Sequence, residues 1–217
     1  HDDVVDESSM RRGRETSNAL FGNSASVLVG DFLYSRAFQM MVSVGSMRIL
    51  DILADATNVI AEGEVLQLLN MHDPEVDEQR YLQVIRFKTA KLFEAAARIG
   101  AVLADADTNT QEDMALAGRS FGTAFQLIDD LLDYSGNSAE LGKNIGDDLR
   151  EGKPTLPLII AMRQGTAVQR TLIENAIRQG DTSALDDVMN IVHACGAMQA
   201  VRKAAQSEIR VAERALS

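Results

Sequence analysis

Proline is nearly absent from this chain, and this scarcity limits how the chain can fold. Only three of its 217 residues are proline. Because proline inside a helix removes a backbone hydrogen bond, long runs without it allow long helices. Alanine and leucine are abundant, and apolar residues recur at the three- and four-residue spacing of amphipathic helices. We therefore predict an all-α protein built as a deep bundle of long helices.

The pattern predicts four long helices followed by shorter ones. The long helices cover residues 23–45, 46–70, 77–105 and 110–134, and the shorter ones cover residues 155–164, 166–179, 182–194 and 197–217. An Asn or Ser at the start of the first helix is expected to cap it. Residues 135–154 contain four glycines and many charges, which predicts a loop too long for a simple connection. No change of composition marks a second domain, so we expect a single domain over residues 1–217.

The chain is acidic, with a formal net charge of −11 and an isoelectric point near 4.7. Such a surface repels nucleic-acid phosphates, so we expect no nucleic-acid partner. No run approaches the roughly 18 apolar residues that read as a membrane-spanning helix. The single cysteine, Cys195, excludes an internal disulfide and a cysteine-based zinc site. The first residues do not have the pattern of a signal peptide, and together these features predict a cytoplasmic protein.

One short motif, Asp-Asp-x-x-Asp, occurs twice. Its members are Asp2, Asp3 and Asp6 in the first copy and Asp129, Asp130 and Asp133 in the second. Residues four apart share one face of a helix, so each copy directs carboxylates to one side, where like charges repel unless a cation lies between them. Carboxylate oxygens suit hard ions, Mg²⁺ above all, and Mg²⁺ commonly joins carboxylates to substrate phosphates.

A solvated acidic helix face is the simpler explanation for a single copy of this motif. The second copy, however, lies among apolar residues in FQLIDDLLDY, where carboxylates are costly unless they line a polar cavity. Basic residues accompany both copies. They are Arg11 and Arg12 after the first, Lys143 and Lys153 after the second, and Lys88 in a predicted helix. Each alone is more simply a surface charge, but their joint placement favours a site for a diphosphate held through Mg²⁺.

Several segments resemble those of the trans-isoprenyl (polyprenyl) diphosphate synthase family. DDVVDESSMRRG resembles the first aspartate motif with its arginine pair, GTAFQLIDDLLDY the second motif, and KNIGDDLREGKPTLPLI the segment after it. GDFLYSRAFQMM, NVIAEGEVLQL and KTAKLFEAAA are similar to the family's helices. The sequence as a whole most resembles those of bacterial octaprenyl diphosphate synthases. The resemblance implies the isoprenoid synthase fold, in which long antiparallel helices surround a central cavity.

The resemblance also implies a reaction. A Mg²⁺-dependent prenyltransferase would condense isopentenyl diphosphate with an allylic diphosphate such as farnesyl diphosphate. The product would be a long trans-polyprenyl diphosphate, such as octaprenyl diphosphate for the side chain of ubiquinone or menaquinone. Cations would stabilise the departing diphosphate, and the double bond of isopentenyl diphosphate would attack the allylic cation, so no protein nucleophile is needed. A homodimer is a further implication.

Metal-binding roles follow from the resemblance position by position. It implies about three Mg²⁺ ions, as is characteristic of the family's paired motifs. Asp2 and Asp6 would hold two of them, with Asp3 in support. Asp129 would hold the third, with Asp130 and Asp133 as ligands or as partners of ligands.

Substrate-binding roles follow in the same way. Arg11, Lys88, Lys143 and Lys153 would contact the allylic diphosphate, and Arg12 the diphosphate of isopentenyl diphosphate. Thr89 and Gln126 would place oxygen dipoles near the developing allylic cation, so that the implied catalytic residues are Lys88, Thr89 and Gln126.

The growing product needs a dry tunnel with a floor that stops elongation. The helix from residue 23 should carry Met40 and Met41 away from the first motif, and Leu53 should lie at a similar depth in the next helix. These three bulky side chains are candidates for the chain-length floor. An ordinary place in the core is the alternative for each.

The family's upstream GGKR-type motif does not occur in this sequence, so we expect the chain to be truncated at the N-terminus and to be inactive by itself. We also expect a truncated C-terminus, because family members usually continue with another helix after a segment such as RVAERALS. Other readings of the two motifs stay open. A class I terpene cyclase usually carries a different second motif, and a noncatalytic partner subunit of a heteromeric synthase tends to lose the aspartates. A helical metal-binding protein without chemistry would not need the basic residues.

Overall fold

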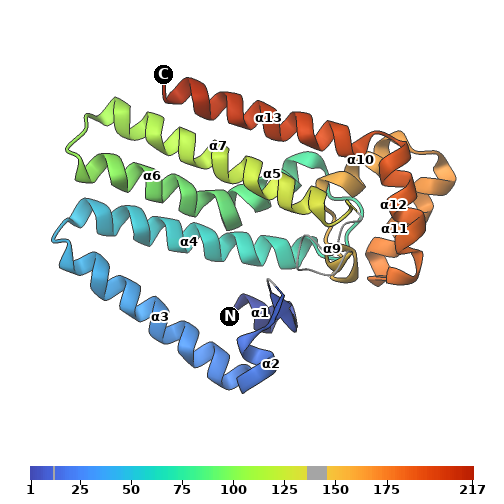
Figure 1. Cartoon of the computed structure of the whole chain (residues 1–217), viewed down its shortest axis with the longest axis horizontal. Helices are drawn as coiled ribbons and strands as arrows, with labels where there is room; N and C mark the ends of the chain where they lie inside the picture. The colour runs from blue at the N-terminus through green and yellow to red at the C-terminus, as the bar shows by residue number, and fades with distance from the viewer. Residues whose placement is uncertain (12, 136–145) are drawn as a thin grey trace. The chain divides into compact units, whose positions relative to one another are not determined.

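The computed structural model describes residues 1–11, 13–135 and 146–217 (Figure 1). By their contacts these residues form two compact units, the first made of residues 1–51 and the second of residues 52–135 and 146–217. Each unit is described by itself. Apart from one short hairpin, the regular structure of the described residues is helical, and the predicted all-α fold is confirmed. The single domain stays a prediction.

The first unit is built around the long helix α3, Asn23–Ser43. Before it come α1 (Asp2–Val5), the strands β1 (Met10–Arg11) and β2 (Arg14–Glu15), and α2 (Ser17–Phe21). The strands pair antiparallel, with Met10 opposite Glu15. Strands of two residues are too short to show an alternating pattern, which is why the sequence did not predict them. The predicted Asn or Ser cap of α3 was wrong, because Gly22 occupies the N-cap and no side chain accepts a hydrogen bond there.

Helix α4 (Met47–Asn70) ends at the turn that contains Pro74, as predicted. The single helix predicted over residues 77–105 is an unbroken helical run with a wider turn inside it. It consists of α5 (Glu78–Ile85), the π-helical segment η1 (Arg86–Ala90) and α6 (Lys91–Leu103). One-turn π segments occur often at functional sites because they change which side chains share a face.

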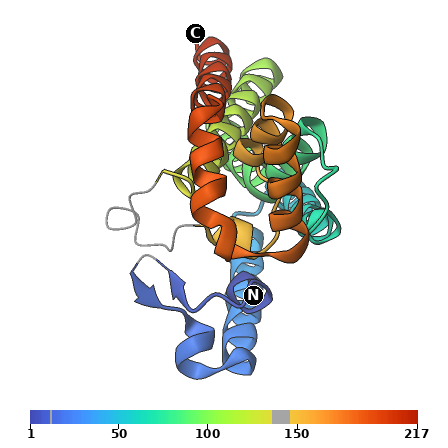
Figure 2. The ribbon, with the colours of Figure 1, turned by 90° about the vertical axis from the view of Figure 1, so that its right-hand side faces the viewer.

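The second unit places α7 (Thr108–Leu132) between α6 and α13 (Ala197–Ala215), and Figures 1 and 2 both show α13 lying alongside α7. Leu127, Leu131 and Tyr134 recur at helical spacing and are buried in the main core. Gly122 allows close packing, because a Cβ there would lie 2.7 Å from the Cα of Ala90 in η1. The end of α7 that carries the second aspartate motif is therefore anchored in the core.

The remaining helices cover this end of α7. They are α9 (Asp147–Arg150), α10 (Leu156–Gln164), α11 (Ala167–Gln179), the 3-10 turn η2 (Thr182–Ala184) and α12 (Leu185–Ala194). Helix α9 lies in the segment that was predicted to be a loop, and residues 136–145 of that segment lie outside the described residues. In the ranges that the structure describes, no helix is long and apolar enough to cross a bilayer.

Candidate active site

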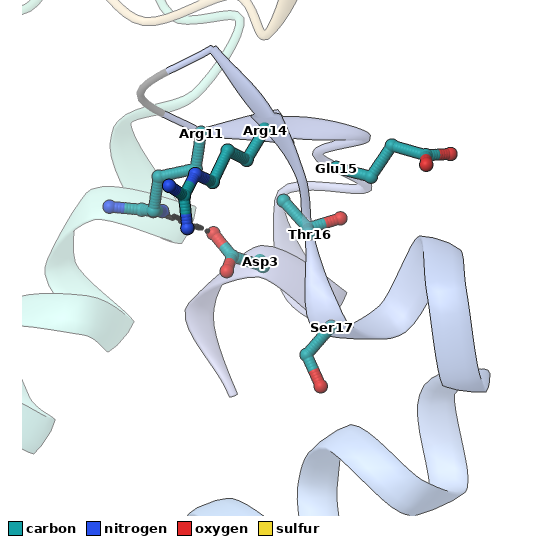
Figure 3. Close-up of a pocket in the computed structure, with 6 residues that line it drawn as sticks. All are labelled: Asp3, Arg11, Arg14, Glu15, Thr16 and Ser17. Carbon is teal, nitrogen blue, oxygen red and sulfur yellow. Dashed lines mark hydrogen bonds and ion pairs between the residues drawn. The ribbon is translucent and has the colours of Figure 1, made fainter.

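The first aspartate motif lies on α1 in the first unit, where it meets an arginine of the hairpin. The guanidinium of Arg11 donates from Nε to Asp3 Oδ1 at 2.8 Å, and its terminal nitrogen lies 2.6 Å from the same oxygen. Asp2 is more distant, 3.9 Å from Arg11. Figure 3 shows Arg11 reaching from the hairpin toward Asp3. The cation predicted beside this motif is therefore in place, and Arg12 lies outside the described residues.

A shallow pocket opens beside this ion pair. Its lining residues are Asp3, Arg11, Arg14, Glu15, Thr16 and Ser17 (Figure 3). Hydrogen bonds to the backbone hold the segments that line it, since the Thr16 hydroxyl donates to the Ser8 carbonyl at 2.7 Å and the Asn18 amide donates to the carbonyls of Asp3 and Ser8. Arg14 was not predicted, although it continues the basic run MRRGR after the motif.

The second aspartate motif ends α7 in the second unit, and its middle carboxylate is buried. Asp130 is 5% exposed, and both of its oxygens accept hydrogen bonds. The Tyr81 hydroxyl donates to one at 2.6 Å and the Gln126 amide to the other at 2.7 Å. Gln126 in turn accepts from the Thr89 hydroxyl at 3.0 Å. A chain of hydrogen bonds thus connects η1, where Thr89 lies, to the motif.

Burial raises the pKa of Asp130 to about 6, since the hydrogen bonds from Tyr81 and Gln126 only partly offset the loss of solvation, and the charge of Asp129 raises it further. The pKa of Asp133 is also raised to about 6, first by burial and then by neighbouring carboxylates. A backbone N–H opposes that shift, because the amide of Asp148 donates to Asp133 Oδ2 at 3.1 Å. The pKa of the Asp148 carboxyl is itself raised by burial and by Asp133.

These raised pKa values bear on whether a metal ion fits. Carboxylates that burial and mutual repulsion push toward the neutral form would regain their charge beside a divalent cation. Among the described residues, no three His, Cys, Asp or Glu side chains converge to hold a metal by themselves. Mg²⁺ suits such an incomplete set, because it usually takes one or two carboxylates and completes its octahedron with waters and substrate phosphates. The donor set around the second motif therefore fits Mg²⁺ shared with a phosphate ligand.

Two of the predicted lysines lie in the second unit. Lys88 in η1 pairs through Nζ with Glu64 of α4 at 2.9 Å. Gly63 allows the close approach of α4 and η1, since a Cβ there would lie 2.5 Å from the backbone nitrogen of Lys88. Lys153 follows α9 and pairs with Glu151. The positive charge of Lys153 lowers the pKa of Asp130 and Asp148 against the effect of burial. Lys143 lies outside the described residues.

A comparison with models of protein families shows to which family the chain belongs. The model of the family described as "Polyprenyl synthetase" matches residues 1–195. The chain belongs to the polyprenyl synthetase family. The resemblance predicted from the motifs is therefore confirmed.

Curated members of the polyprenyl synthetase family include close relatives. The chain is 56% identical over 209 residues to the octaprenyl diphosphate synthase of Escherichia coli K12, which covers 96% of this chain and 65% of the relative. It is 58% identical over 193 residues to the octaprenyl diphosphate synthase of Haemophilus influenzae, which covers 88% of this chain and 59% of the relative. The chain thus spans about two thirds or less of the length of these relatives.

A solved polyprenyl synthetase has the same fold. The polyprenyl synthase of Caulobacter crescentus, crystallised with calcium and isoprenyl diphosphate, superposes with a TM-score of 0.95 at 45% identity, covering 100% of this chain and 66% of that one. This agreement confirms the isoprenoid synthase type of helical fold.

The structure brings together some of the predicted site residues and adds others. Thr89, Gln126 and Asp130 are joined by hydrogen bonds, as described above. Tyr81 and Asp148 were missed. Asp148 lies in the segment GDDLREGK that carried the resemblance, whereas nothing in the sequence pointed to Tyr81 as a partner of the motif.

The residues predicted to form the chain-length floor belong to both units. Met40 and Met41 lie on α3, Met40 with 64% of its surface exposed and Met41 half-buried. Leu53 lies on α4 and is half-buried. Their role as a floor stays a prediction.

Proposed function

We propose that this chain forms the main part of a trans-polyprenyl diphosphate synthase, which condenses isopentenyl diphosphate with an allylic diphosphate such as farnesyl diphosphate. The observation that carries the proposal is the buried carboxylate cluster at the end of α7, in which Asp130 and Asp133 have raised pKa values. Such a cluster is costly in an apolar setting unless it serves a cation. High identity to two octaprenyl diphosphate synthases makes octaprenyl diphosphate the product we propose.

The proposed cofactor is Mg²⁺, with three ions. Asp129 and Asp133 would hold one at the second motif, where Tyr81 and Gln126 orient Asp130 beside them. Asp2 and Asp6 would hold the other two, with Asp3 oriented by Arg11. When bound, Mg²⁺ would supply the positive charge that lets a diphosphate leave.

The chain's own residues would then bind and orient the substrates. Arg11, Lys88, Lys143 and Lys153 would contact the allylic diphosphate, and Arg12 the diphosphate of isopentenyl diphosphate. Thr89 and Gln126, held to each other at 3.0 Å, would direct oxygen dipoles at the carbon where positive charge develops. Leaving-group stabilisation and positioning supply the catalysis, and no nucleophilic side chain takes part.

The biological setting is part of the proposal. The identity to octaprenyl diphosphate synthases supports a product that becomes the side chain of ubiquinone or menaquinone. We also propose a cytoplasmic homodimer, since α3 exposes a series of large apolar side chains that a second copy could cover. They include Leu28, Phe32, Leu33, Met40 and Val42.

The test is a condensation assay with the full-length protein that carries this sequence. Radiolabelled isopentenyl diphosphate and farnesyl diphosphate should give a long-chain product in Mg²⁺ and none after chelation. Reversed-phase chromatography of the dephosphorylated product should show a C40 chain. A folded full-length protein that turns over only when a second, different subunit is added would favour the noncatalytic partner instead, and a cyclic hydrocarbon product would indicate a terpene cyclase.

A further inference from the structure

The turn after α4 contains a histidine in an unusual backbone conformation. His72 has φ +61°, in the left-handed region that few residues other than glycine adopt. Two hydrogen bonds hold it there. Its backbone N–H donates to the Gly152 carbonyl at 2.8 Å, and its ring Nδ1 lies 3.0 Å from the carbonyl of Ile177. Because a carbonyl only accepts, Nδ1 carries the proton.

The ring of His72 lies directly against Gly152. A Cβ at Gly152 would come within 2.2 Å of His72 Nδ1 and 2.4 Å of Cε1, so only glycine fits beside this ring. Gly152 also has φ +69°, which favours glycine independently. Gly180, at the end of α11, completes the contact, since a Cβ there would meet the His72 ring at 3.5 Å. His72 therefore joins the turn after α4, the segment after α9 and the end of α11.

Gly152 is adjacent to the residues that face the carboxylate cluster. The next residue is Lys153, whose backbone N–H donates to the Asp148 carbonyl at 2.8 Å. The backbone N–H of Asp148 donates to Asp133 in the second motif. Leu149, which is fully buried, anchors α9 at one end of this segment. At the other end, the ring of His72 contacts Gly152 and holds it in place. A shift of Gly152 would move Lys153 first.

We propose that His72 is a positioning residue for the diphosphate site, which holds Gly152 so that Lys153 points at the substrate diphosphate. The inference rests on the proposed function, because it takes the ligand of Lys153 to be the allylic diphosphate. His72 does not touch the substrate. It acts through a backbone hydrogen bond and a ring contact, in the way that the outer partners of a site orient the groups that bind.

The experiment compares three variants in the full-length protein. His72→Ala removes the ring and its bond to Ile177. His72→Asn keeps the tolerance for positive φ and an amide donor close to the position of Nδ1. Arg80→Ala is the matched control, because Arg80 bonds Asn70 and Asp73 in the same turn but does not contact Gly152. Thermal melting of each variant separates loss of fold from loss of position.

We expect His72→Ala to raise the KM for the allylic diphosphate roughly 10- to 100-fold, the usual effect of removing such a partner. The KM for isopentenyl diphosphate should change much less, since Lys153 is assigned to the other substrate. His72→Asn should recover most of the loss, and Arg80→Ala should behave as wild type. Adding His72→Ala to Lys153→Ala should raise the allylic KM no further, because both changes remove the same contact.

Equal increases in both KM values, or an Arg80→Ala variant as impaired as His72→Ala, would assign His72 a purely structural role. A folded His72→Ala variant with wild-type kinetics would overturn the proposal outright. An inactive wild-type protein would contradict the proposed function instead. Hydrogen exchange over residues 147–155 separates the two cases, because faster exchange in His72→Ala, but not in Arg80→Ala, is expected whatever the activity.

Discussion

The two aspartate motifs have the same spacing but lie in different surroundings. The first occupies a four-residue helix, where the side chain of its middle residue, Asp3, is 24% exposed and that of the pairing Arg11 is 56% exposed. The second ends a helix of 25 residues that is packed on two sides, and its middle carboxylate is 5% exposed. The same motif therefore forms one site whose charges are screened by solvent and one whose carboxylates depend on neighbouring groups to stay ionised.

The difference shows how each motif is supported. The first relies on a cationic side chain, Arg11, which can exchange one anionic partner for another. The second relies on neutral donors, Tyr81 and Gln126, and on a backbone N–H. These donors and the charge of Lys153 only partly offset burial, so the pKa of Asp130 stays raised until a metal ion binds. We infer that the second motif depends more strongly on bound metal for its stability.

The largest expected effect tests whether both motifs serve the reaction. In the full-length protein, Asp129→Ala and Asp2→Ala should each lower kcat/KM by roughly 10²- to 10³-fold, since each removes a ligand that stabilises the leaving diphosphate. Circular dichroism should show unchanged helix content. The matched control is Asp51→Ala, an aspartate with 74% of its side chain exposed in an ordinary surface pair with Arg48. Near-normal turnover in either motif variant would remove that motif from the metal assignment.

Next in size is the pH dependence of the metal-free protein. Asp130 and Asp133 have folded pKa values near 6, above their ordinary value of 3.8, so their contribution to stability is complete below about pH 4 and is lost as pH rises through about 6. One pKa unit corresponds to about 1.4 kcal/mol. Ionisation of these two carboxyls should therefore make the free energy of unfolding a few kcal/mol lower at pH 7.5 than at pH 4.

Urea unfolding at a series of pH values measures this effect, to which the buried Asp148 carboxyl adds. Asp130→Asn should make the decline less steep, because it removes one of these ionisations. Mg²⁺ with inorganic diphosphate should stabilise the wild type most at pH 7.5, where the carboxylates are charged. The Asp2→Asn variant should keep the wild-type dependence of unfolding free energy on pH. If Asp130→Asn keeps it as well, the second motif does not carry the pH dependence.

A smaller effect is expected when one of the neutral hydrogen-bond donors to Asp130 is removed. Tyr81→Phe removes the hydroxyl from a buried carboxylate, and an unsatisfied buried group of this kind costs roughly 1–3 kcal/mol. The measurement is the free energy of unfolding at pH 7.5, with the Mg²⁺ concentration for half-maximal rate as a second readout. Tyr34→Phe is the control, since Tyr34 is an exposed tyrosine of α3. A Tyr81→Phe variant as stable as the control would mean that Asp130 does not need this bond.

The smallest effect is expected at the first motif. Arg11→Ala should change the free energy of unfolding by about 0–1 kcal/mol, the usual range for an exposed ion pair. It should nevertheless raise the KM for the allylic diphosphate, because Arg11 is assigned to bind it. A stability loss as large as that of Tyr81→Phe would show that the two motifs are supported alike, contrary to the comparison above.

The long helices could be predicted from the sequence because their apolar periodicity repeats over many turns. Helices α3, α4 and α7 begin and end within two residues of the predicted ranges. The π-helical turn in η1 could not be predicted, since it changes the hydrogen-bond ladder without changing the apolar period. The two-residue strands left no pattern to detect, and Gly22 caps α3 where a polar side chain was expected.

The sequence by itself determined the fold class, the family and the residue types of the site, because these depend on periodicity and on motifs read along the chain. Only the tertiary structure decided which carboxylate is buried and what holds it. Tyr81 meets Asp130 across 49 residues, and His72 meets Gly152 and Ile177 from a different part of the chain. These partners are far apart in the sequence and come together only when the chain packs. The free energy that stabilises each pair comes from burial in the folded state, so no local sequence pattern reveals them.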